Sequence, residues 1–445
     1  MAFTSEIFVL FALVFFPVFW ILERFDRNYA VIFCALSSFL AVAFNFPLFA
    51  LIPLYQTLLI VLYCASRKTP FSLGLTITLL VMPLLLFKYT EFFVRQFYGC
   101  FIFDIGLPLG ISFYTFTAIG YVVDIYKDKS LQPPKSTFFK TLNLLTYWPH
   151  LAAGPILRAE NMRVENGKSG LLQRDWYTAS VLIVCGLYKK VVIADGVAAL
   201  IGYNLKAGIG SMNNLDALAT VVGFSIRIYG DFSGYSDMAI GFALLMGIRL
   251  PANFNYPYES KSLTEFWRRW HTSLSFWFRD YLYIPLGGNR HSLLVTSLII
   301  LFVFFISGLW HGASWGFIIW SLIHGLFLVA EKIGRHYDLH LNDVSAYIIT
   351  VTVVTLSWAF FFLNPHEAIL ILSKIFAGKP SYLSYHTFSI FFYAFLVFLE
   401  FTIKPYRVVN GFPQATRSGL VLTPLFLTVC FYFAGKGLPF IYFDF

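Results

Sequence analysis

The stretch FFISGLWHGASWGFIIWSLIHGLFLVAEK, residues 304–332, decides the fold of this chain. It continues an apolar run from residue 293 to residue 330, which is too long for one bilayer crossing of about 20 residues. The Ser- and Gly-rich residues 307–314 form the natural break between two membrane helices. His311 lies at that break, so we expect its imidazole inside a helix bundle rather than at a surface.

The composition extends this interpretation to the whole chain. Of its 445 residues, 58% are hydrophobic and 12% are charged, whereas a soluble domain carries about 25% charged residues. Apolar stretches long enough to cross a bilayer recur along almost the whole length. We therefore predict an all-α polytopic membrane protein, with residues 1–445 in a single integral membrane domain of about 11 crossings. Segments that carry Pro, Gly and charge are expected to form re-entrant or interfacial helices.

The net charge of +9 invites a nucleic-acid interpretation, but the distribution of the charge argues against nucleic acid as a partner. The Lys and Arg residues are spread through short loops rather than clustered on one face. The loops ERFDRN, ASRKT and YKDKSLQPPKSTFFK hold 2, 2 and 4 of them. By the positive-inside rule these loops face the cytoplasm and its anionic membrane lipid, and the N-terminus faces outward.

Polar residues crowd into an otherwise apolar span within IYGDFSGYSDMAIGFALLMGIRLPANFNYPY, residues 228–258. Asp231, Ser233 and Asp237 are candidates for a polar core, because polar residues inside a membrane are costly and are usually functional. Carboxylates in such a setting need hydrogen-bond donors nearby. The alternative is that these side chains hold neighbouring helices together by hydrogen bonding.

The segment LTEFWRRWHTSLSFWFRDYLYIPLGGNR, residues 263–290, combines charged residues with tryptophans. Such a helix belongs at the membrane interface or in a re-entrant dip, and His271 lies one turn from Arg268. The glycines of PLGGNR allow close backbone approach, so Arg279, Arg290 and exposed amides are candidates for binding a phosphate-bearing ligand. Polar side chains at three- and four-residue spacing predict one stripe on a single helix: Glu265, Arg268, Thr272, Ser275 and Arg279.

A further histidine, His324, follows His311 by 13 residues in the next apolar helix. A histidine on an apolar face is usually a packing residue, and both interpretations stay open for His324. His271, His311 and His324 show none of the spacings of a metal site such as HExxH. The five cysteines are isolated, without a CxxC pair. We therefore expect no metal.

Taken together, these segments resemble the membrane-bound O-acyltransferase superfamily. Within it, the chain is most similar to the alginate O-acetylase and peptidoglycan O-acetyltransferase branch. The resemblance covers roughly residues 105–330 in order and rests on these segments: LPLGISFYTFTAIGYVVDIYK (107–127), AAGPILR (152–158), DFSGYSDMAIG (231–241), NFNYPY (253–258), EFWRRWHTSLSFWFRDYLYIPLGGNR (265–290) and SGLWHG (307–312).

The resemblance implies a membrane-bound O-acyltransferase fold, in which core helices of residues 105–335 surround a central tunnel. Further spans are expected before this core, in residues 1–100, and after it, in residues 346–436. The resemblance also implies that His311 is the catalytic histidine, acting as a general base, and that His271 is a second polar residue of the active site.

The same resemblance implies a donor, an acceptor and a location. Acetyl-CoA is the expected donor and enters from the cytoplasmic side. The acceptor is a polysaccharide outside the cell, alginate-like or peptidoglycan, reached through an SGNH-type acetyltransferase partner at the outer face of the bacterial cytoplasmic (inner) membrane. The residues expected to bind the donor are Arg268, Arg269, Arg279 and Arg290.

The aromatic tail GLPFIYFDF, residues 437–445, carries one hydroxyl, on Tyr442. Members of the branch resemble each other in a C-terminal aromatic–x–Tyr–x–x–Phe motif, which FIYFDF matches, and this implies that Tyr442 is an acyl carrier. A phenol, with a reference pKa near 10, is a better-matched nucleophile for a histidine base than a sugar hydroxyl. The alternative is that Tyr442 anchors the tail at the membrane interface.

Other cargoes and another class of protein remain as alternatives. An enzyme of this family could carry D-alanine to teichoic acid, or a fatty acyl chain to a lipid. A transporter or channel could use the same polar core as a permeation path. Transporters usually show an internal repeat of hydropathy, and the halves of this chain show none.

Overall fold

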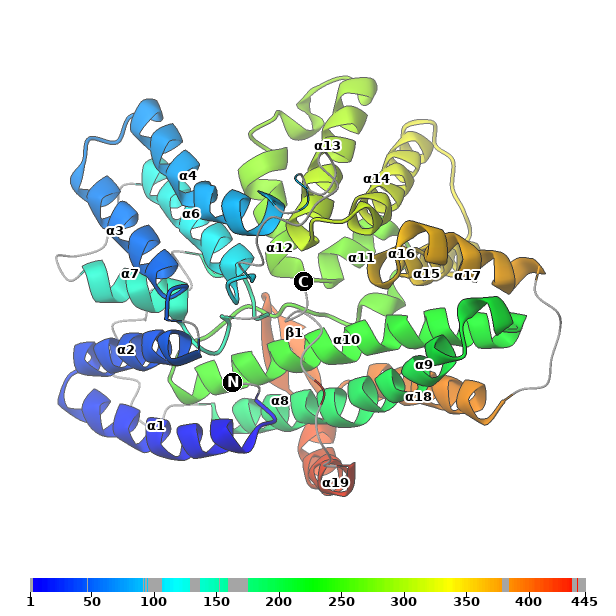
Figure 1. The fold of residues 1–445 in the computed structure, drawn as a ribbon, viewed down its shortest axis with the longest axis horizontal. Helices are drawn as coiled ribbons and strands as arrows, with labels where there is room; N and C mark the ends of the chain where they lie inside the picture. Colours follow the sequence, from blue (N-terminus) through cyan, green and yellow to red (C-terminus); the bar gives the residue numbers. More distant parts are fainter. Residues whose placement is uncertain are drawn as a thin grey trace. The chain divides into compact units, whose positions relative to one another are not determined.

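The computed structural model describes residues 3–45, 47–90, 92, 94, 106–128, 137–151, 153–158, 175–377, 384–433 and 438. Within these residues the regular structure is helical apart from one short β-hairpin (Figure 1). The chain divides into two compact units, residues 1–183 with 238–251 and residues 184–237 with 252–445. Two helices, α8 (Trp176–Tyr188) and α10 (Asn214–Leu245), contribute residues to both units.

The first unit is built around an aromatic core. The indole of Trp148 lies 5.5 Å from the ring of Phe8 and 5.5 Å from that of Phe242, and the indole of Trp20 donates to the backbone oxygen of Leu245. Large rings remove much apolar surface from the surroundings, which explains how short helices pack here. Besides parts of α8 and α10, its elements are α1 (Glu6–Phe25), α2 (Arg27–Asn45), α3 (Leu51–Ala65), α4 (Pro70–Leu84), η1 (Leu85–Tyr89), α6 (Ile111–Lys127) and α7 (Thr137–Thr146).

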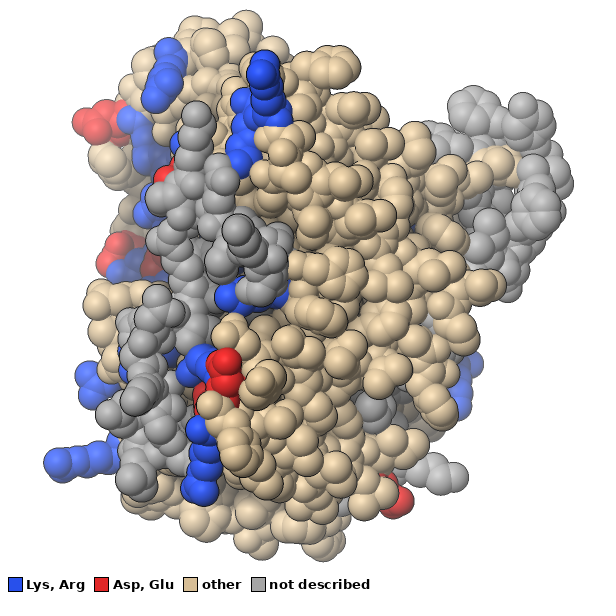
Figure 2. All heavy atoms as spheres, turned by 90° about the vertical axis from the view of Figure 1, so that its left-hand side faces the viewer, with Lys and Arg blue, Asp and Glu red and all other residues tan. Residues whose placement is uncertain are grey.

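Charged residues of this unit collect at helix ends. Arg24 lies in the last turn of α1 and Lys127 in the last turn of α6, and Arg67 lies between α3 and α4. Figure 2, which faces the left-hand side of Figure 1, shows Lys and Arg side chains gathered along one side of this face, beside a broad surface without charged side chains. This arrangement agrees with helix ends that face anionic lipid on one side of a membrane.

The second unit carries the histidines of interest. Its helices α13 and α14 pack along each other (Figure 1), and the predicted break between them is confirmed, because α13 ends at His311 and the Ser314 hydroxyl caps α14. Besides parts of α8 and α10, its elements are η5 (Lys189–Ala194), α9 (Asp195–Lys206), η6 (Ile209–Ser211), η7 (Pro257–Glu259), α11 (Leu263–Arg269), α12 (Thr272–Phe278), η8 (Arg279–Tyr283), η9 (Gly288–Arg290), α13 (Leu293–His311), α14 (Trp315–His336), α15 (Asp343–Ser357), α16 (Ala359–Phe362), α17 (Pro365–Ala377), α18 (Tyr385–Ile403), β1 (Tyr406–Val409), β2 (Phe412–Ala415) and α19 (Arg417–Phe433).

Among the described residues, 7 helices are long and apolar enough to cross a bilayer. They confirm an all-α, multi-pass membrane protein. The number is below the predicted total because several apolar segments form shorter helices. Thus α6 has 17 residues and α7 has 10 residues. The apolar helices α3 and α19 are also shorter than 18 residues.

The β-hairpin is a feature that sequence reasoning missed. Strands β1 and β2 pair antiparallel, with Val409 opposite Phe412. Between them, Asn410 and Gly411 both have positive φ, 52° and 83°, which is the type I′ turn that Asn-Gly favours. The dipeptide was therefore a signal for a hairpin in a region where only helices were expected.

Small residues let η5 and the end of α8 approach α10 closely. A Cβ built on Gly234 of α10 would lie 2.7 Å from the backbone oxygen of Gly186 and 3.1 Å from Cβ of Lys189. Glycine at this position therefore sets the spacing between the two backbones, as small residues do between membrane helices.

We predict that Gly234→Ala destabilises the protein, although alanine favours a helix by up to about 1 kcal/mol over glycine. The matched control is Gly74→Ala in α4, where a Cβ would meet nothing within 4 Å. The measurement is the midpoint of thermal unfolding of each purified variant in detergent, which should fall for Gly234→Ala and stay or rise for Gly74→Ala. Equal midpoints for the two variants would show that this close approach does not limit stability.

Candidate active site

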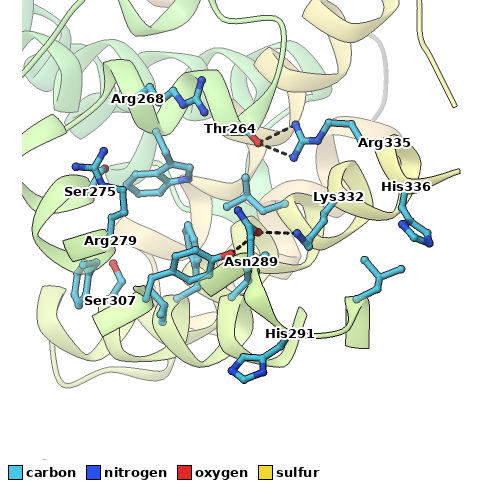
Figure 3. A pocket seen from close by; sticks show the side chains of 18 of the residues that line it. Thr264, Arg268, Ser275, Arg279, Asn289, His291, Ser307, Lys332, Arg335 and His336 are labelled. Carbon is cyan, nitrogen blue, oxygen red and sulfur yellow. Dashed lines mark hydrogen bonds between the residues drawn. The ribbon is translucent and has the colours of Figure 1, made fainter. Parts of the chain in front are cut away.

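A cavity of about 1000 Å³ opens in the second unit between α11, α12, η8, α13 and α14 (Figure 3). Its wall combines cationic side chains with apolar ones, which suits a ligand that carries both a charged and an apolar part. Arg268 and Arg279 lie on one side in Figure 3, and Lys332, Arg335 and His336 lie on the other. The apolar part of the wall includes Trp267, Leu274, Phe278, Ile300, Val303, Phe304 and Leu328.

The structure separates the predicted donor-binding arginines into two groups. Arg268 and Arg279 line the cavity, whereas Arg269 and Arg290 are not among its lining residues. Arg269 instead bonds to Glu265 at 2.8 Å and to Glu259 at 3.3 Å. Arg269 is directed to these two carboxylates, whereas Arg268, the residue before it, is directed to the cavity.

Sequence reasoning missed the cations on the other side of the cavity. Lys332, Arg335 and His336 lie in the last turns of α14 at three- and four-residue spacing, so they share a face of that helix. Lys332 donates to Oδ1 of Asn289 at 2.8 Å, which places the PLGGNR turn at the cavity through Asn289. This spacing was a signal for a cationic helix face. It is not specific, because ordinary membrane helices also end in charged residues.

The prediction that one helix carries the polar stripe from Glu265 to Arg279 is wrong. Helix α11 ends at Arg269 and α12 begins at Thr272, with His271 between them in the left-handed region at φ 42°. An extended segment stabilises the break: Thr272 N–H donates to the backbone oxygen of Asn253 at 3.0 Å, and Asn255 N–H donates to that of Arg269 at 2.9 Å. These bonds satisfy backbone groups that helix ends otherwise leave unpaired.

His271 is fully buried at this break. Its Nδ1 lies 3.2 Å from Oδ1 of Asn253. Its ring packs edge-on against Phe232 at 4.6 Å and lies 5.8 Å from the indole of Trp310. A non-glycine residue with positive φ carries a conformational cost of about 1–3 kcal/mol, and such strain collects at functional sites.

His311, at the end of α13, sits in an aromatic cage. Its ring lies 4.9 Å from that of Trp310, 5.1 Å from Trp320 and 5.2 Å from Phe361. The indole of Trp310 therefore lies beside both imidazoles, those of His271 and His311. His311 is not among the residues that line the cavity, but Ser307, one helical turn before it, is.

His324 has the surroundings of a packing residue. It is fully buried, and its Nε2 lies 2.9 Å from the hydroxyl of Ser357. Its ring is 5.0 Å from Trp320 and 5.4 Å from Trp267. Since Trp267 also lines the cavity, His324 lies behind the cavity wall.

The two predicted polar-core carboxylates are held by buried lysines that sequence reasoning did not single out. Lys189 Nζ lies 2.9 Å from Asp237 and 2.8 Å from Glu400. Lys190 Nζ lies 2.7 Å from Asp231 and is paired with a second carboxylate as well. These contacts supply the cationic partners that buried carboxylates require, and they favour the helix-clamping interpretation of Asp231 and Asp237.

Two further predicted site residues are Ser233 and Tyr442. Ser233 is fully buried, and its hydroxyl has no hydrogen-bond partner among the described residues. Tyr442 lies outside the described residues. Over the part of the chain that the structure describes, no group of three or more His, Cys, Asp or Glu side chains is placed to hold a metal ion.

Comparisons with known proteins match most of the chain. The MBOAT, membrane-bound O-acyltransferase family matches residues 62–374. A peptidoglycan O-acetyltransferase from Helicobacter pylori is 36% identical over 326 residues, which cover 66% of this chain and 62% of that protein. A probable alginate O-acetylase from Pseudomonas aeruginosa is 40% identical over 256 residues, which cover 57% of this chain and 48% of that protein. The chain thus matches less than two thirds of the length of these relatives.

We predict that Lys189→Met destabilises the protein by about 3–5 kcal/mol, because it leaves buried carboxylates without their cation. The control is Lys261→Met, which breaks a pair with Asp343 whose side chains are 54% and 77% exposed; such a pair contributes about 0–1 kcal/mol. Thermal unfolding in detergent compares the variants. A midpoint for Lys189→Met that matches the control would show that the buried pairs contribute little to stability.

Proposed function

Because the chain belongs to the membrane-bound O-acyltransferase family, we propose that it is a membrane O-acetyltransferase. In this proposal it takes acetyl from cytoplasmic acetyl-CoA and delivers it for O-acetylation of an extracytoplasmic polysaccharide, alginate-like or peptidoglycan. The names of its relatives, a peptidoglycan O-acetyltransferase and a probable alginate O-acetylase, support this choice of cargo and acceptor. The bacterial sources of these relatives support a place in the bacterial cytoplasmic membrane.

The single observation that carries the proposal is the cationic cavity whose lining includes Ser307, one helical turn before His311. Coenzyme A carries phosphates and a long arm that ends in the thioester. Arg268, Arg279, Lys332 and Arg335 line the cavity and can form charge-assisted hydrogen bonds to phosphate oxygens. The apolar wall can then contact the arm, with Ser307 one turn from the proposed base.

The proposed reaction is acyl transfer with histidine as the base. The acceptor oxygen bonds to the thioester carbonyl carbon, and the carbon–sulfur bond breaks. His311 takes the hydroxyl proton as the oxygen adds, and returns it to the departing sulfur as the thiol forms. The aromatic cage around His311 excludes water, which limits hydrolysis of the thioester. His271, joined to His311 through Trp310, is the second polar group of the site.

The proposed acceptor within the chain is Tyr442. Because this tyrosine is tethered to the enzyme, its effective concentration at the site exceeds that of a free hydroxyl. The aryl ester formed there remains reactive, so a second enzyme can pass acetyl to the polysaccharide. The expected partner is an SGNH-type acetyltransferase on the outer face of the membrane. The competing role, an interfacial anchor, would hold the amphipathic ring of Tyr442 at the headgroups without forming an ester.

We predict that acetyl-CoA labelled in its acetyl group transfers label to Tyr442 of the purified protein, mapped by mass spectrometry. His311→Ala and Tyr442→Phe should each abolish the label, because one removes the base and the other removes the nucleophile. Tyr442→Phe removes the hydroxyl but keeps the aromatic ring, so it separates loss of the nucleophile from loss of ring packing. Undiminished label in either variant would reject that residue's role, and label only from D-alanyl or fatty acyl donors would change the cargo.

We also predict that Arg268→Ala and Arg335→Ala raise the KM for acetyl-CoA about 10- to 100-fold, since each removes one charge-assisted hydrogen bond of about 1.5–3 kcal/mol. The comparison variant is Arg290→Ala, because Arg290 is outside the cavity lining. Initial rates across acetyl-CoA concentrations measure the effect. A larger effect at Arg290 than at Arg268 would move the donor site away from this cavity.

A further inference from the structure

Asn253 connects the break at His271 to α10. Its side chain is almost fully buried, and its Nδ2 donates to the hydroxyl of Ser236 on α10 at 3.3 Å. Its Oδ1 lies 3.2 Å from the backbone N of Ser273, 2.9 Å from the Ser273 hydroxyl and 3.2 Å from Nδ1 of His271. Three contacts thus converge on one amide oxygen.

The partners of Asn253 decide which amide atom faces His271. A backbone N–H can only donate, so the atom that meets Ser273 N–H must be the carbonyl oxygen rather than the amide nitrogen. Turning the amide over would place the Nδ2 donors of Asn253 against that N–H. The position of Oδ1 therefore follows from chemistry and not from an arbitrary choice between two atoms of similar size.

An oxygen at this place also decides the tautomer of His271. A carbonyl oxygen can only accept, so a hydrogen bond between it and the imidazole requires the proton on Nδ1. We infer that Asn253 is a positioning residue that holds His271 in its Nδ1–H tautomer, so that Nε2 carries the lone pair. This inference deepens the proposed function, because it gives His271 a proton-accepting rather than a donating role in acyl transfer.

The backbone supports the same arrangement. His271 has positive φ, and the cost of that conformation is offset by the two backbone hydrogen bonds from residues 253–255 that bracket it. Asn253 therefore makes two contacts with residues at the break. Its backbone oxygen accepts from Thr272 N–H, and its side-chain oxygen contacts Nδ1 of His271. A ring held on both sides in this way keeps one orientation, which a catalytic hydrogen bond requires.

The protonation state of His271 agrees with an acceptor. His271 lies between α11 and α12, outside the candidate spans, and burial lowers the pKa of its imidazole to about 3. At neutral pH the ring is therefore uncharged and holds one proton. With that proton on Nδ1, the unprotonated Nε2 can accept a proton or a hydrogen bond, but it cannot donate to a developing oxyanion.

The test is the tautomer itself, measured by nitrogen NMR of the full chain labelled with 15N-histidine. The His271 signals are assigned by their loss in His271→Gln. We expect a protonated Nδ1 and an unprotonated Nε2 in the unmodified protein, and a protonated Nε2 or a mixture in Asn253→Leu. If Asn253→Leu does not fold, the measurement on the unmodified protein is sufficient. A protonated Nε2 of His271 in the unmodified protein would overturn the inference.

Two matched variants separate positioning from packing. Ser273→Ala removes one hydrogen bond from the same amide oxygen but leaves the imidazole contact, so the tautomer should not change. Asn253→Asp keeps an oxygen acceptor, so it should keep the proton on Nδ1. A changed tautomer in Ser273→Ala, or an unchanged one in folded Asn253→Leu, would contradict the role of Asn253.

Kinetics then test the proposed function separately from the tautomer. If His271 accepts a proton in acyl transfer, Asn253→Leu should lower kcat about 100-fold, the lower range for a general acid–base group, with the KM for acetyl-CoA unchanged. Ser273→Ala should retain most of the activity. An altered tautomer with an unchanged kcat would support the positioning role while removing His271 from the chemistry.

Discussion

The ion pairs of Lys189 and Lys190 are the contacts on which the candidate site depends. They join η5 to α10 through Asp237 and Asp231, and α10 in turn carries Phe232 and Ser236. Phe232 packs on His271, and Ser236 bonds to Asn253. In an apolar bundle an unpaired charge is very costly, so the pairs allow few positions for α10. The helix on which His271 and Asn253 pack is therefore positioned by electrostatics as well as by packing.

The candidate site keeps its cationic side chains apart from its histidines. The cations line a cavity, whereas the histidines lie beyond it among aromatic rings. Trp267 belongs to both regions, since it lines the cavity and packs against His324 and Trp320. A donor of the proposed kind needs both environments, with water and phosphates at one end and a dry reactive centre at the other. The aromatic layer between them explains why so many Trp and Phe residues occur in residues 263–332.

The features that were predictable from the sequence are those with a local signal. His311 was placed at a helix break because the apolar run exceeds one crossing, and Ser314 marks the following helix start. The break at His271 was not predictable, because no Gly or Pro marks it and its hydrogen bonds come from residues 252–255, which are distant in the chain. The partners of Asp231 and Asp237 required tertiary structure for the same reason. Nothing in the described residues tests Tyr442.

The β-hairpin braces the candidate site from outside the residues that the family match covers. The family match ends at residue 374, yet the hairpin turn accepts a hydrogen bond from Ala252 N–H at Gly411, and Tyr406 accepts one from the hydroxyl of Tyr256. Both donors flank the residues that bracket the break at His271. The end of the family match is therefore not the end of the folding unit. A chain shortened to residue 374 would lack the braces of the candidate site.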